Sequence, residues 1–346
     1  MYSVDRENFK RYLVNFPKQI VQSQKIFNKS KFRLANKSIS NVIYLGMGGS
    51  AIVGDILSEV LFDDLIFPIQ VNRGYKIPGY CSNSSLVIAS SYSGDTEETL
   101  HALTLAEKSG AKIVAITSGG QLLKLAEKKK WPVYRIPGGY HPRQAFGYLF
   151  FLAYQVVLKF MGMQTSSEEF TSLIQLTKSI VHRSDEQNVD GKVFTKDLAM
   201  RIKNKIPIIY STAPYLTTVA TRWKNQFQEN SKSMAFSNVL PEMNHNEIVG
   251  WEMENKSLKE YLVLFLENTN PDSRIDARVQ LTKNIIRDKG TEVIEIYTEG
   301  DTLLQQAISL INISDWVSYY LALLYEKDPA SIVNIDYLKG ELKKQS

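Results

Sequence analysis

The sequence predicts an α/β fold made of two doubly wound modules, each a parallel sheet flanked by helices. Short runs of apolar and β-branched residues alternate with longer stretches of helical periodicity, a pattern typical of strands joined by crossover helices. These runs form two series separated by a polar stretch of helical character. The length of 346 residues favours two domains, or one large α/β unit, over a single small module.

The first series comprises four predicted strands, each followed by polar or glycine-rich residues and then a helical pattern. The strands are Val42–Leu45, Leu86–Ala89, Ile113–Ile116 and Val133–Ile136. Parallel strands need a crossover connection, so we expect a helix after each of them. A helix-rich arm over residues 5–29 precedes the series.

The second series repeats this order of runs. Its predicted strands are Pro207–Tyr210, Tyr261–Phe265 and Val293–Ile296. The parallel order suggests two copies of one α/β module, although no residue-level identity supports a repeat. Residues 164–204 are polar and helical in pattern, with Gly191 as a break, and are interpreted as a linker. An amphipathic helical tail closes the chain.

The composition is that of an ordinary globular protein. Hydrophobic residues make up 44% and charged residues 22%, which excludes disordered, collagen-like and disulfide-framework classes. The 41 basic and 36 acidic residues leave a net charge of +5. Their densest basic run, Lys128–Lys130, is most simply the solvated end of a helix. We therefore expect no nucleic-acid partner, whereas mild basicity suits a small anionic substrate.

The cysteine content and the apolar runs predict a cytoplasmic protein that does not interact with membranes. A single cysteine, Cys81, can form neither an intrachain disulfide nor a cysteine-rich zinc site. Residues 1–20 carry several charges and no continuous apolar stretch, so no signal or anchor is expected there. The longest uncharged run, Gln144–Leu158, is shorter than the roughly 20 residues of a membrane span and is interpreted as a buried core helix.

A glycine-rich loop follows the first predicted strand. Gly46, Gly48 and Gly49 stand directly before a predicted helix start, where backbone N–H groups can face an anion. The loop is neither a dinucleotide fingerprint, because no acidic residue ends the next predicted strand, nor a Walker A loop, because no Lys-Ser/Thr pair follows. Tight strand-to-helix packing explains the glycines equally well.

Three hydroxyl side chains follow the second predicted strand of the first series. Ser91, Ser93 and Thr96 surround a glycine in a strand-to-helix turn, where hydroxyls and the helix N-terminus can converge on one phosphate. The alternative is helix capping, since Ser or Thr followed by Glu three residues later forms a capping box. A cap uses one hydroxyl, and this turn holds three, which favours a phosphate site.

These motifs resemble a known family. GMGGS at residues 46–50 and SYSGDTEET at 91–99 resemble the sugar isomerase (SIS) domain, a five-stranded parallel α/β module that binds phosphosugars. PRQAFGY at 142–148, WKNQFQENSK at 223–232 and NHNE at 244–247 resemble the bifunctional phosphoglucose/phosphomannose isomerases. The resemblance runs from about residue 40 to the C-terminus. Together with the arm and the linker that the sequence pattern predicts, it divides the chain into an N-terminal arm (1–30), a first SIS domain (31–163), a linker (164–204) and a second SIS domain with a helical tail (205–346).

The resemblance implies an isomerase that interconverts glucose 6-phosphate and mannose 6-phosphate with fructose 6-phosphate through an enediol(ate), without a cofactor or metal. The partner molecule is then a small hexose phosphate. The resemblance also implies a homodimer in which the histidine of one subunit completes the site of its neighbour. The residues it assigns to the substrate and its phosphate are Gly49, Ser50, Ser91, Ser93, Thr96 and Arg143.

Four residues match the catalytic positions of the family. Glu229 fits the base that moves a proton between C2 and C1, and His245 fits the group that opens the sugar ring. Arg143 resembles the arginine that stabilises the enediolate, and Lys339 the lysine that assists at the ring oxygen. Taken without the resemblance, Glu229 is a surface residue near a helix end, His245 is a capping or core residue, and Lys339 belongs to a solvated helix end.

Three other functions were considered beside the bifunctional isomerase. A zinc-dependent phosphomannose isomerase needs more ligands than Glu242 and His245 provide. A sugar-phosphate sensor built from SIS modules would keep the hydroxyls but would not need Glu229, His245 and Arg143 together. Only substrate profiling distinguishes an isomerase of another phosphosugar from the bifunctional isomerase. The segment at residues 138–141 is bulkier than the family pattern, which leaves the choice between glucose and mannose open.

Overall fold

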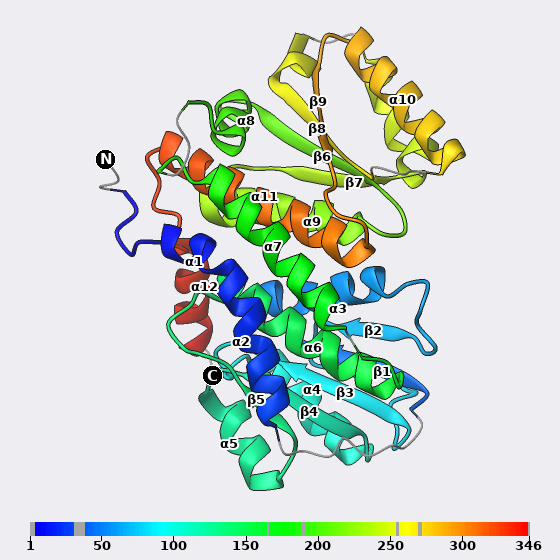
Figure 1. The fold of residues 1–346 in the computed structure, drawn as a ribbon, viewed down its shortest axis with the longest axis vertical. Coiled ribbons are helices and arrows are strands. Elements are labelled where there is room, and N and C mark those ends of the chain that lie inside the picture. Colours follow the sequence, from blue (N-terminus) through cyan, green and yellow to red (C-terminus); the bar gives the residue numbers. More distant parts are fainter. Residues whose placement is uncertain are drawn as a thin grey trace. The chain divides into compact units, whose positions relative to one another are not determined.

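The computed structural model describes residues 4–30, 39–164, 166–187, 191–253, 256–268 and 272–344. The chain packs as two compact units, each built around one sheet (Figure 1). The first-sheet unit comprises residues 15–178 and 302–307, and the second-sheet unit comprises residues 1–14, 179–301 and 308–346. These units describe packing, and the domain borders proposed from the sequence remain a prediction.

The first-sheet unit contains five parallel strands in the order β2-β1-β3-β4-β5. The strands are β1 (Asn41–Leu45), β2 (Ile69–Asn72), β3 (Ser85–Ser90), β4 (Lys112–Thr117) and β5 (Val133–Arg135). The four strands predicted for this series are confirmed. Strand β2 was not predicted, because this short edge strand is only half-buried and its sequence, IQVN, lacks a continuous apolar run.

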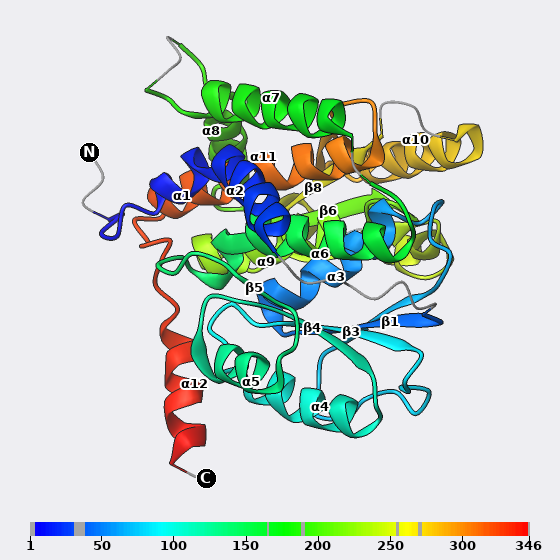
Figure 2. The same cartoon turned by 60° about the horizontal axis from the view of Figure 1, so that its bottom comes forward.

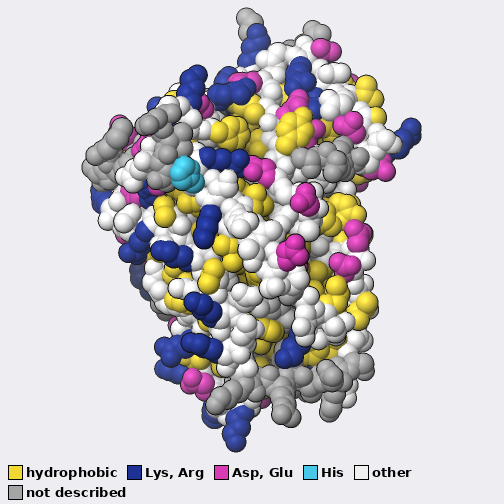
Figure 3. Space-filling view, viewed as in Figure 1, with side chains coloured by type: hydrophobic (Ala, Val, Ile, Leu, Met, Phe, Trp, Pro, Cys, Tyr) yellow, Lys and Arg dark blue, Asp and Glu magenta, His cyan; other side chains and the backbone are white. Residues whose placement is uncertain are grey.

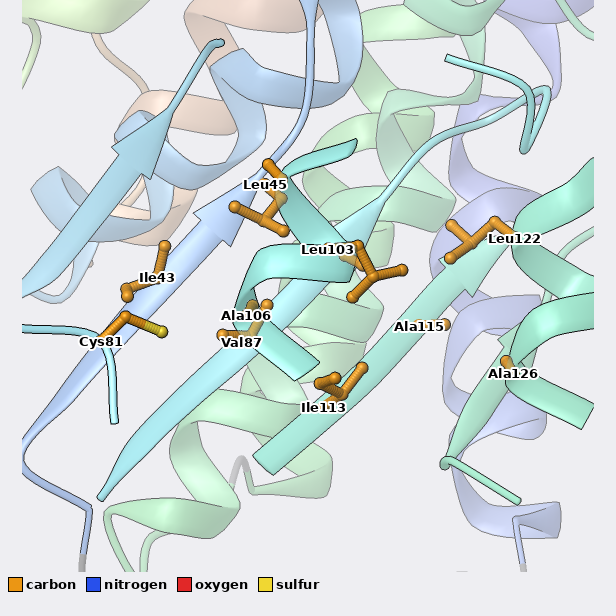
Figure 4. Packing of buried hydrophobic residues seen from close by; sticks show 12 residues of the cluster. Ile43, Leu45, Cys81, Val87, Leu103, Ala106, Ile113, Ala115, Leu122 and Ala126 are labelled. Atoms are coloured by element: carbon orange, nitrogen blue, oxygen red, sulfur yellow. The ribbon is translucent and has the colours of Figure 1, made fainter. Parts of the chain in front are cut away.

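Helices cover both faces of the first sheet (Figures 1 and 2). They are α2 (Phe16–Lys29), α3 (Gly48–Val60), α4 (Glu97–Lys108), α5 (Gly120–Lys129) and α6 (Phe146–Phe160), with the 3₁₀ turn η1 (Pro142–Ala145) before α6. In Figure 2, α3 and α6 lie on one side of the strands, and α4 and α5 on the other. Alternate residues of β1, β3 and β4, such as Ile43, Val87 and Ala115, pack against Leu103 of α4 and Leu122 of α5 (Figure 4).

The second-sheet unit contains, among the described residues, four parallel strands in the order β7-β6-β8-β9. They are β6 (Ile206–Thr212), β7 (Phe236–Leu240), β8 (Tyr261–Glu267) and β9 (Glu292–Tyr297). The three predicted strands are confirmed, and β7, a partly exposed edge strand, was missed. In chain order, both sheets begin with the arrangement second-first-third-fourth, so the topology supports two copies of one module.

The second-sheet unit carries α9 and α11 on one face of its sheet and α10 on the other (Figure 1). Its elements are α1 (Lys10–Val14), α8 (Phe194–Ile202), α9 (Thr217–Ser231), α10 (Ser273–Asp288), α12 (Val333–Lys343), and the 3₁₀ turns η2 (Glu242–His245), η3 (Glu247–Glu252) and η4 (Lys256–Glu260). Two of the four borders between the units fall inside helices, one in α7 (Ser167–Ser184) and one in α11 (Leu303–Leu324), and the other two lie between α1 and α2 and before α11.

Two long apolar helices are buried. Residues 146–158 of α6 are all buried, which confirms the predicted core helix. Among the described residues, α11 alone is long and apolar enough to cross a membrane by length and composition, and 89% of its apolar window is buried inside the protein. Helix α11 was not predicted as a core helix, because Asp315 interrupts its apolar sequence. Such burial is typical of a core helix of a globular protein.

Charged side chains are spread over the face of the molecule that Figure 3 draws. On the face drawn in Figure 3, Lys and Arg side chains lie singly or in small groups among uncharged and acidic ones. The run Lys128–Lys130 ends α5 as expected: Lys128 and Lys129 lie in its last turn, and Lys130 is the C-cap residue.

Candidate active site

The strand order of the first sheet creates a place for a ligand at its carboxyl edge. The chain goes from β1 to β2 on one side and then to β3 on the other side of β1. The loops after β1 and β3 therefore leave the sheet in opposite directions, and a crevice opens between them at such a point. Both predicted phosphate motifs lie in these two loops.

The loop after β1 leads directly into α3. Gly48 has a φ of +49°, a conformation that side-chain-bearing residues rarely adopt. A Cβ on Gly46 would lie 3.1 Å from the carbonyl oxygen of Ser90, so Gly46 serves the packing of β1 on β3. Ser50 is buried in the first turn of α3, and no side chain caps that helix. The first turn of α3 therefore has the geometry of an anion site.

The loop after β3 brings two of its hydroxyls together. Oγ of Ser91 lies 2.9 Å from Oγ1 of Thr96 and accepts a hydrogen bond from the backbone N–H of Gly94 (3.1 Å). Ser91 is buried, whereas Ser93 is exposed, with Oγ accepting from the N–H of Asp95. Thr96 occupies the N-cap position of α4, yet its side chain makes no capping hydrogen bond. Capping therefore does not account for the Thr96 hydroxyl.

The loop after β4 holds this turn in shape. Gly94 has a φ of +77°, and a Cβ built on it would lie 1.9 Å from the carbonyl oxygen of Gly119. The N–H of Leu122 donates to the carbonyl of Gly94 (2.9 Å), and Oδ1 of Asp95 accepts from the N–H of Gln121 (2.9 Å). This supporting loop was not predicted, although the Gly119-Gly120 pair after a predicted strand was a signal for it.

Arg143 lies next to the loop after β1. It belongs to η1 and is 3% exposed. A Cβ on Gly49 would lie 3.1 Å from both N and Cα of Arg143, so the two backbones are in direct contact. The preceding segment is fixed as well, because the N–H of Tyr140 donates to the hydroxyl of Tyr92 (2.7 Å). The first-sheet unit thus brings Arg143 to the predicted phosphate loops.

Glu229 lies in the last turn of α9, in the second-sheet unit. The aromatic residues before it, Trp223 and Phe227, are fully buried, while Glu229 is partly exposed. Buried polar contacts hold α9 against α11: Nη2 of Arg222 lies 3.0 Å from Oδ1 of Asp315, and the indole N–H of Trp223 donates to the carbonyl of Leu310 (3.0 Å). The helix that carries Glu229 is therefore rigidly placed in this unit.

Lys339 lies in α12, where its side chain is exposed. Tyr337 and Leu338 beside it are 65% and 59% exposed. The turn before α12 is bonded to the end of α9, because Nζ of Lys232 donates to the carbonyl of Asp328 (2.6 Å). The second-sheet unit thus ties the segment leading to Lys339 to the helix of Glu229.

His245 ends η2 and is exposed, on a segment that polar contacts hold from several sides. The Glu247 carboxylate accepts hydrogen bonds from the Tyr210 hydroxyl and from the Asn238 amide. Tyr210 and Asn238 are register partners on β6 and β7. Burial, and then the hydrogen bond to Glu247, raise the pKa of Tyr210. Glu247 belongs to the NHNE motif, but no role was predicted for it.

The topology of the second sheet separates Glu229 from His245. Helix α9 runs antiparallel to the strands, so Glu229 in its last turn lies at the amino edge. His245 follows β7 and therefore lies at the carboxyl edge. The five residues of β7 rise about 3.3 Å each, which puts roughly 16 Å between the two edges. Within one second-sheet unit, these two residues are not brought together.

The described part of the chain contains no group of three or more His, Cys, Asp or Glu side chains that could hold a metal ion. The site residues are instead hydroxyls, backbone N–H groups, an arginine and single carboxylate and imidazole groups. Such a set can bind a phosphate and move a proton.

Comparison with known proteins identifies the family. The chain is 38% identical over 328 residues to the bifunctional phosphoglucose/phosphomannose isomerase of Caldicellulosiruptor bescii, covering 95% of this chain and 97% of that protein. The chain belongs to the bifunctional phosphoglucose/phosphomannose isomerase family. The relative from Aquifex aeolicus that bears the same description is 36% identical over 310 residues, covering 88% of this chain and 91% of that protein.

Further comparisons agree with this family. Residues 194–342 match the family described as bacterial phospho-glucose isomerase C-terminal SIS domain. A solved structure of a hypothetical protein from Thermus thermophilus superposes with a TM-score of 0.78 at 15% identity, covering 96% of this chain and 89% of that one, which shows likeness of fold. The α/β fold of SIS type and membership of an isomerase family, both expected from the sequence, are thus confirmed.

Proposed function

We propose that the protein interconverts glucose 6-phosphate and mannose 6-phosphate with fructose 6-phosphate through an enediol(ate) intermediate. The observation that carries this proposal is the hydroxyl turn after β3, with Arg143 and the start of α3 at the same edge of the sheet. Similarity to relatives described as bifunctional phosphoglucose/phosphomannose isomerases over nearly the whole chain supports it.

The first-sheet unit binds the phosphate in this proposal. Hydroxyls of Ser50, Ser91, Ser93 and Thr96 donate to phosphate oxygens, as does the backbone N–H of Gly49. The N-terminus of α3 contributes its partial positive charge. Arg143 adds a full positive charge, which stabilises the negative oxygen of the enediolate as it develops.

The second-sheet unit supplies the proton chemistry. Glu229 removes the proton from C2 of the open-chain aldose and returns it to C1, which gives the ketose. His245 and Lys339 open the ring by moving protons at the anomeric hydroxyl and the ring oxygen. Carbon C2 is planar in the enediolate, so one base can serve both the glucose and the mannose epimers. The reaction moves protons only, so we propose no cofactor and no metal.

A homodimer is part of the proposal, because one chain holds Glu229 and His245 at opposite edges of its second sheet. A twofold axis would let the His245 of one subunit act on the substrate held with Glu229 of the other, and would create two equivalent sites. The single cysteine and the metabolite substrate fit a cytoplasmic enzyme.

A coupled assay for fructose 6-phosphate, started separately from each aldose, tests the function. We expect turnover of both glucose 6-phosphate and mannose 6-phosphate, and activity that survives dialysis against EDTA. Turnover of glucose 6-phosphate alone would support only the phosphoglucose isomerase activity and refute the phosphomannose isomerase activity. Binding without turnover of either aldose would favour a sugar-phosphate sensor, and activity on a different phosphosugar would favour the other isomerase.

A further inference from the structure

The C-terminal end of α9 has an unusual cap. Lys232 stands at the C-cap in the left-handed conformation, with a φ of 56°, and its N–H donates to the carbonyl of Phe227. Its Nζ donates to three backbone carbonyls: those of Glu229 (2.9 Å), Asn230 (3.1 Å) and Asp328 (2.6 Å). The side chain thus folds back over the end of its own helix and reaches a second segment.

These bonds satisfy groups that a helix end leaves open. The last four carbonyls of an α-helix have no N–H partner within the helix, and Glu229 and Asn230 belong to the last turn of α9. Glycine usually occupies the left-handed position after a helix, because a Cβ is strained there. A lysine at this position keeps that strain and gains an ammonium group, which carries three N–H donors for three carbonyls.

The residues between Glu229 and Lys232 are held from the other side. Nδ2 of Asn230 donates to Oγ of Ser318 (2.9 Å), and Oγ of Ser231 donates to the carbonyl of Ser318 (2.8 Å). Both bonds are buried and run to α11. The last turn of α9 is therefore fixed by α11 on one side and by the Lys232 ammonium on the other. Glu229 remains partly exposed in this turn, as does Gln228, whereas Asn230 and Ser231 are buried.

We propose that Lys232 is a positioning residue for Glu229. Its ammonium holds the last turn of α9 to the turn at Asp328 that leads into α12, so the base keeps one place relative to the segment of Lys339. The inference rests on the proposed function of Glu229. Misplacing a catalytic group by about 1 Å can cost a factor of 100 in rate, so loss of this bond should lower kcat.

The variant Lys232→Gly tests the contribution of the Lys232 side chain separately from that of the left-handed backbone conformation. Glycine accepts the left-handed conformation without strain, so any loss in this variant comes from the missing ammonium. Lys130→Gly is a matched control. Lys130 is also a C-cap lysine, has a φ of 57°, and ends α5 in the first-sheet unit. It has no part in the proposed chemistry.

The experiment measures kcat and KM of both variants with glucose 6-phosphate, and amide hydrogen exchange over residues 226–232 and 326–332. For Lys232→Gly we expect kcat to fall roughly 10- to 100-fold with KM nearly unchanged, and faster exchange in both segments. Lys130→Gly should match the wild type in kcat, in KM and in exchange over these segments.

Two results would overturn the inference: a kcat of Lys232→Gly within about twofold of that of Lys130→Gly, or a loss that lies wholly in KM. Unchanged exchange over both segments would also overturn it. A wild-type protein without isomerase activity would instead refute the proposed function, and the exchange measurement would then decide alone whether Lys232 holds the two segments together.

Discussion

Oγ of Ser91 and Oγ1 of Thr96 lie 2.9 Å apart, although five positions of chain separate the two residues. The turn between them closes because the Gly94 N–H donates to the same Ser91 oxygen. A closed turn presents its hydroxyls and the start of α4 to one point at the edge of the sheet. A phosphate bound there would find donors already in position, which lowers the entropic cost of binding.

Removing two of these hydroxyls should weaken substrate binding. For the double variant Ser91→Ala/Ser93→Ala we expect KM for both hexose phosphates to rise strongly, because each lost hydrogen bond to a charged group is worth roughly 1.5–3 kcal/mol. Steady-state kinetics measure the effect. Ser109→Ala is the control, since Ser109 caps the far end of α4, away from the Ser91–Thr96 turn, and its hydroxyl donates to the carbonyl of Leu105. An unchanged KM in the double variant would remove these serines from phosphate binding.

Two glycines with the same backbone conformation should respond very differently to substitution. Gly94 and Gly110 have φ values of +77° and +76°. A Cβ on Gly94 would meet the Gly119 carbonyl oxygen at 1.9 Å, whereas on Gly110 its nearest neighbour would be Cβ of Asn83 at 3.7 Å. Gly110→Ala should therefore cost only the conformational strain, about 1–2 kcal/mol. Gly94→Ala should cost clearly more.

Thermal and urea unfolding of both glycine variants check this difference. The Gly94→Ala variant should also show a raised KM, because the Ser91–Thr96 turn must move. Equal destabilisation of the two variants would mean that the contact between Gly94 and Gly119 does not constrain the turn.

The core strands could be predicted because buried parallel strands are continuous apolar runs in the sequence. Polar residues interrupt the apolar ones in the edge strands β2 (IQVN) and β7 (FSNVL), and this removed the signal that the prediction used. Without β7, the sequence could not place His245 at the carboxyl edge of the second sheet. The phosphate motifs were predictable because their glycines and hydroxyls are local in the chain.

Contacts between distant segments could not be predicted. Gly49 and Arg143 touch across more than 90 positions of sequence, and one of the three carbonyls bound by Lys232 belongs to the distant Asp328. Such pairs depend on the register of whole helices, which periodicity alone does not determine. The role of Glu247 was missed for the same reason, since its donors Tyr210 and Asn238 come from two neighbouring strands.

Glu247 should be needed to hold the segment of His245. In Glu247→Gln, the carboxylate that accepts from Tyr210 and Asn238 is replaced by an amide with one acceptor oxygen. The buried Tyr210 hydroxyl then competes with Asn238, and we expect a loss of about 1–3 kcal/mol in stability and a lower kcat. Glu242→Gln is the control, because the exposed contact from Nδ2 of Asn246 to Oε1 of Glu242 survives in glutamine. Similar kcat values for the two variants would contradict this role.

The cluster around Lys283 predicts a pH-dependent stability. Lys283 is fully buried, with Nζ 3.0 Å from Oε1 of Glu267 and 3.2 Å from Oε1 of Glu295. Burial would raise the pKa of Glu295, but hydrogen bonds from Tyr297, Arg287 and Lys283 lower it from 4.5 to about 2. For Glu267 burial outweighs the lysine, and its pKa is raised.

A lowered folded-state pKa stabilises the protein above the unfolded value and loses that effect as the pH falls. Glu295→Gln should therefore lower Tm clearly at pH 7, and the difference from the wild type should shrink as the pH falls from about 4.5 towards 2. Glu292→Gln is the control on the same strand, because Glu292 pairs with Arg201 in an exposed ion pair of small worth. A Tm difference for Glu295→Gln that is independent of pH would contradict the assignment.

The separation of Glu229 and His245 within one chain leads to a test by mixed dimers. In the proposed homodimer, Glu229→Gln and His245→Ala proteins are each nearly inactive, because every site lacks one group. A mixed dimer differs: one of its sites collects both substitutions, and the other receives an intact Glu229 from one chain and an intact His245 from its partner.

Co-refolding the two inactive variants should therefore restore activity. Random pairing makes half of the dimers mixed, and each mixed dimer has one complete site of two, so recovery should approach about a quarter of wild-type activity. Exchange of subunits is verified independently with distinguishable tags. In the control, the Glu229→Gln protein is refolded alone, and we expect no recovery of activity. If exchange occurs without recovery, His245 acts within its own chain or not at all. The roughly 16 Å between the edges of the second sheet would then have to be bridged by the substrate or by a change in conformation.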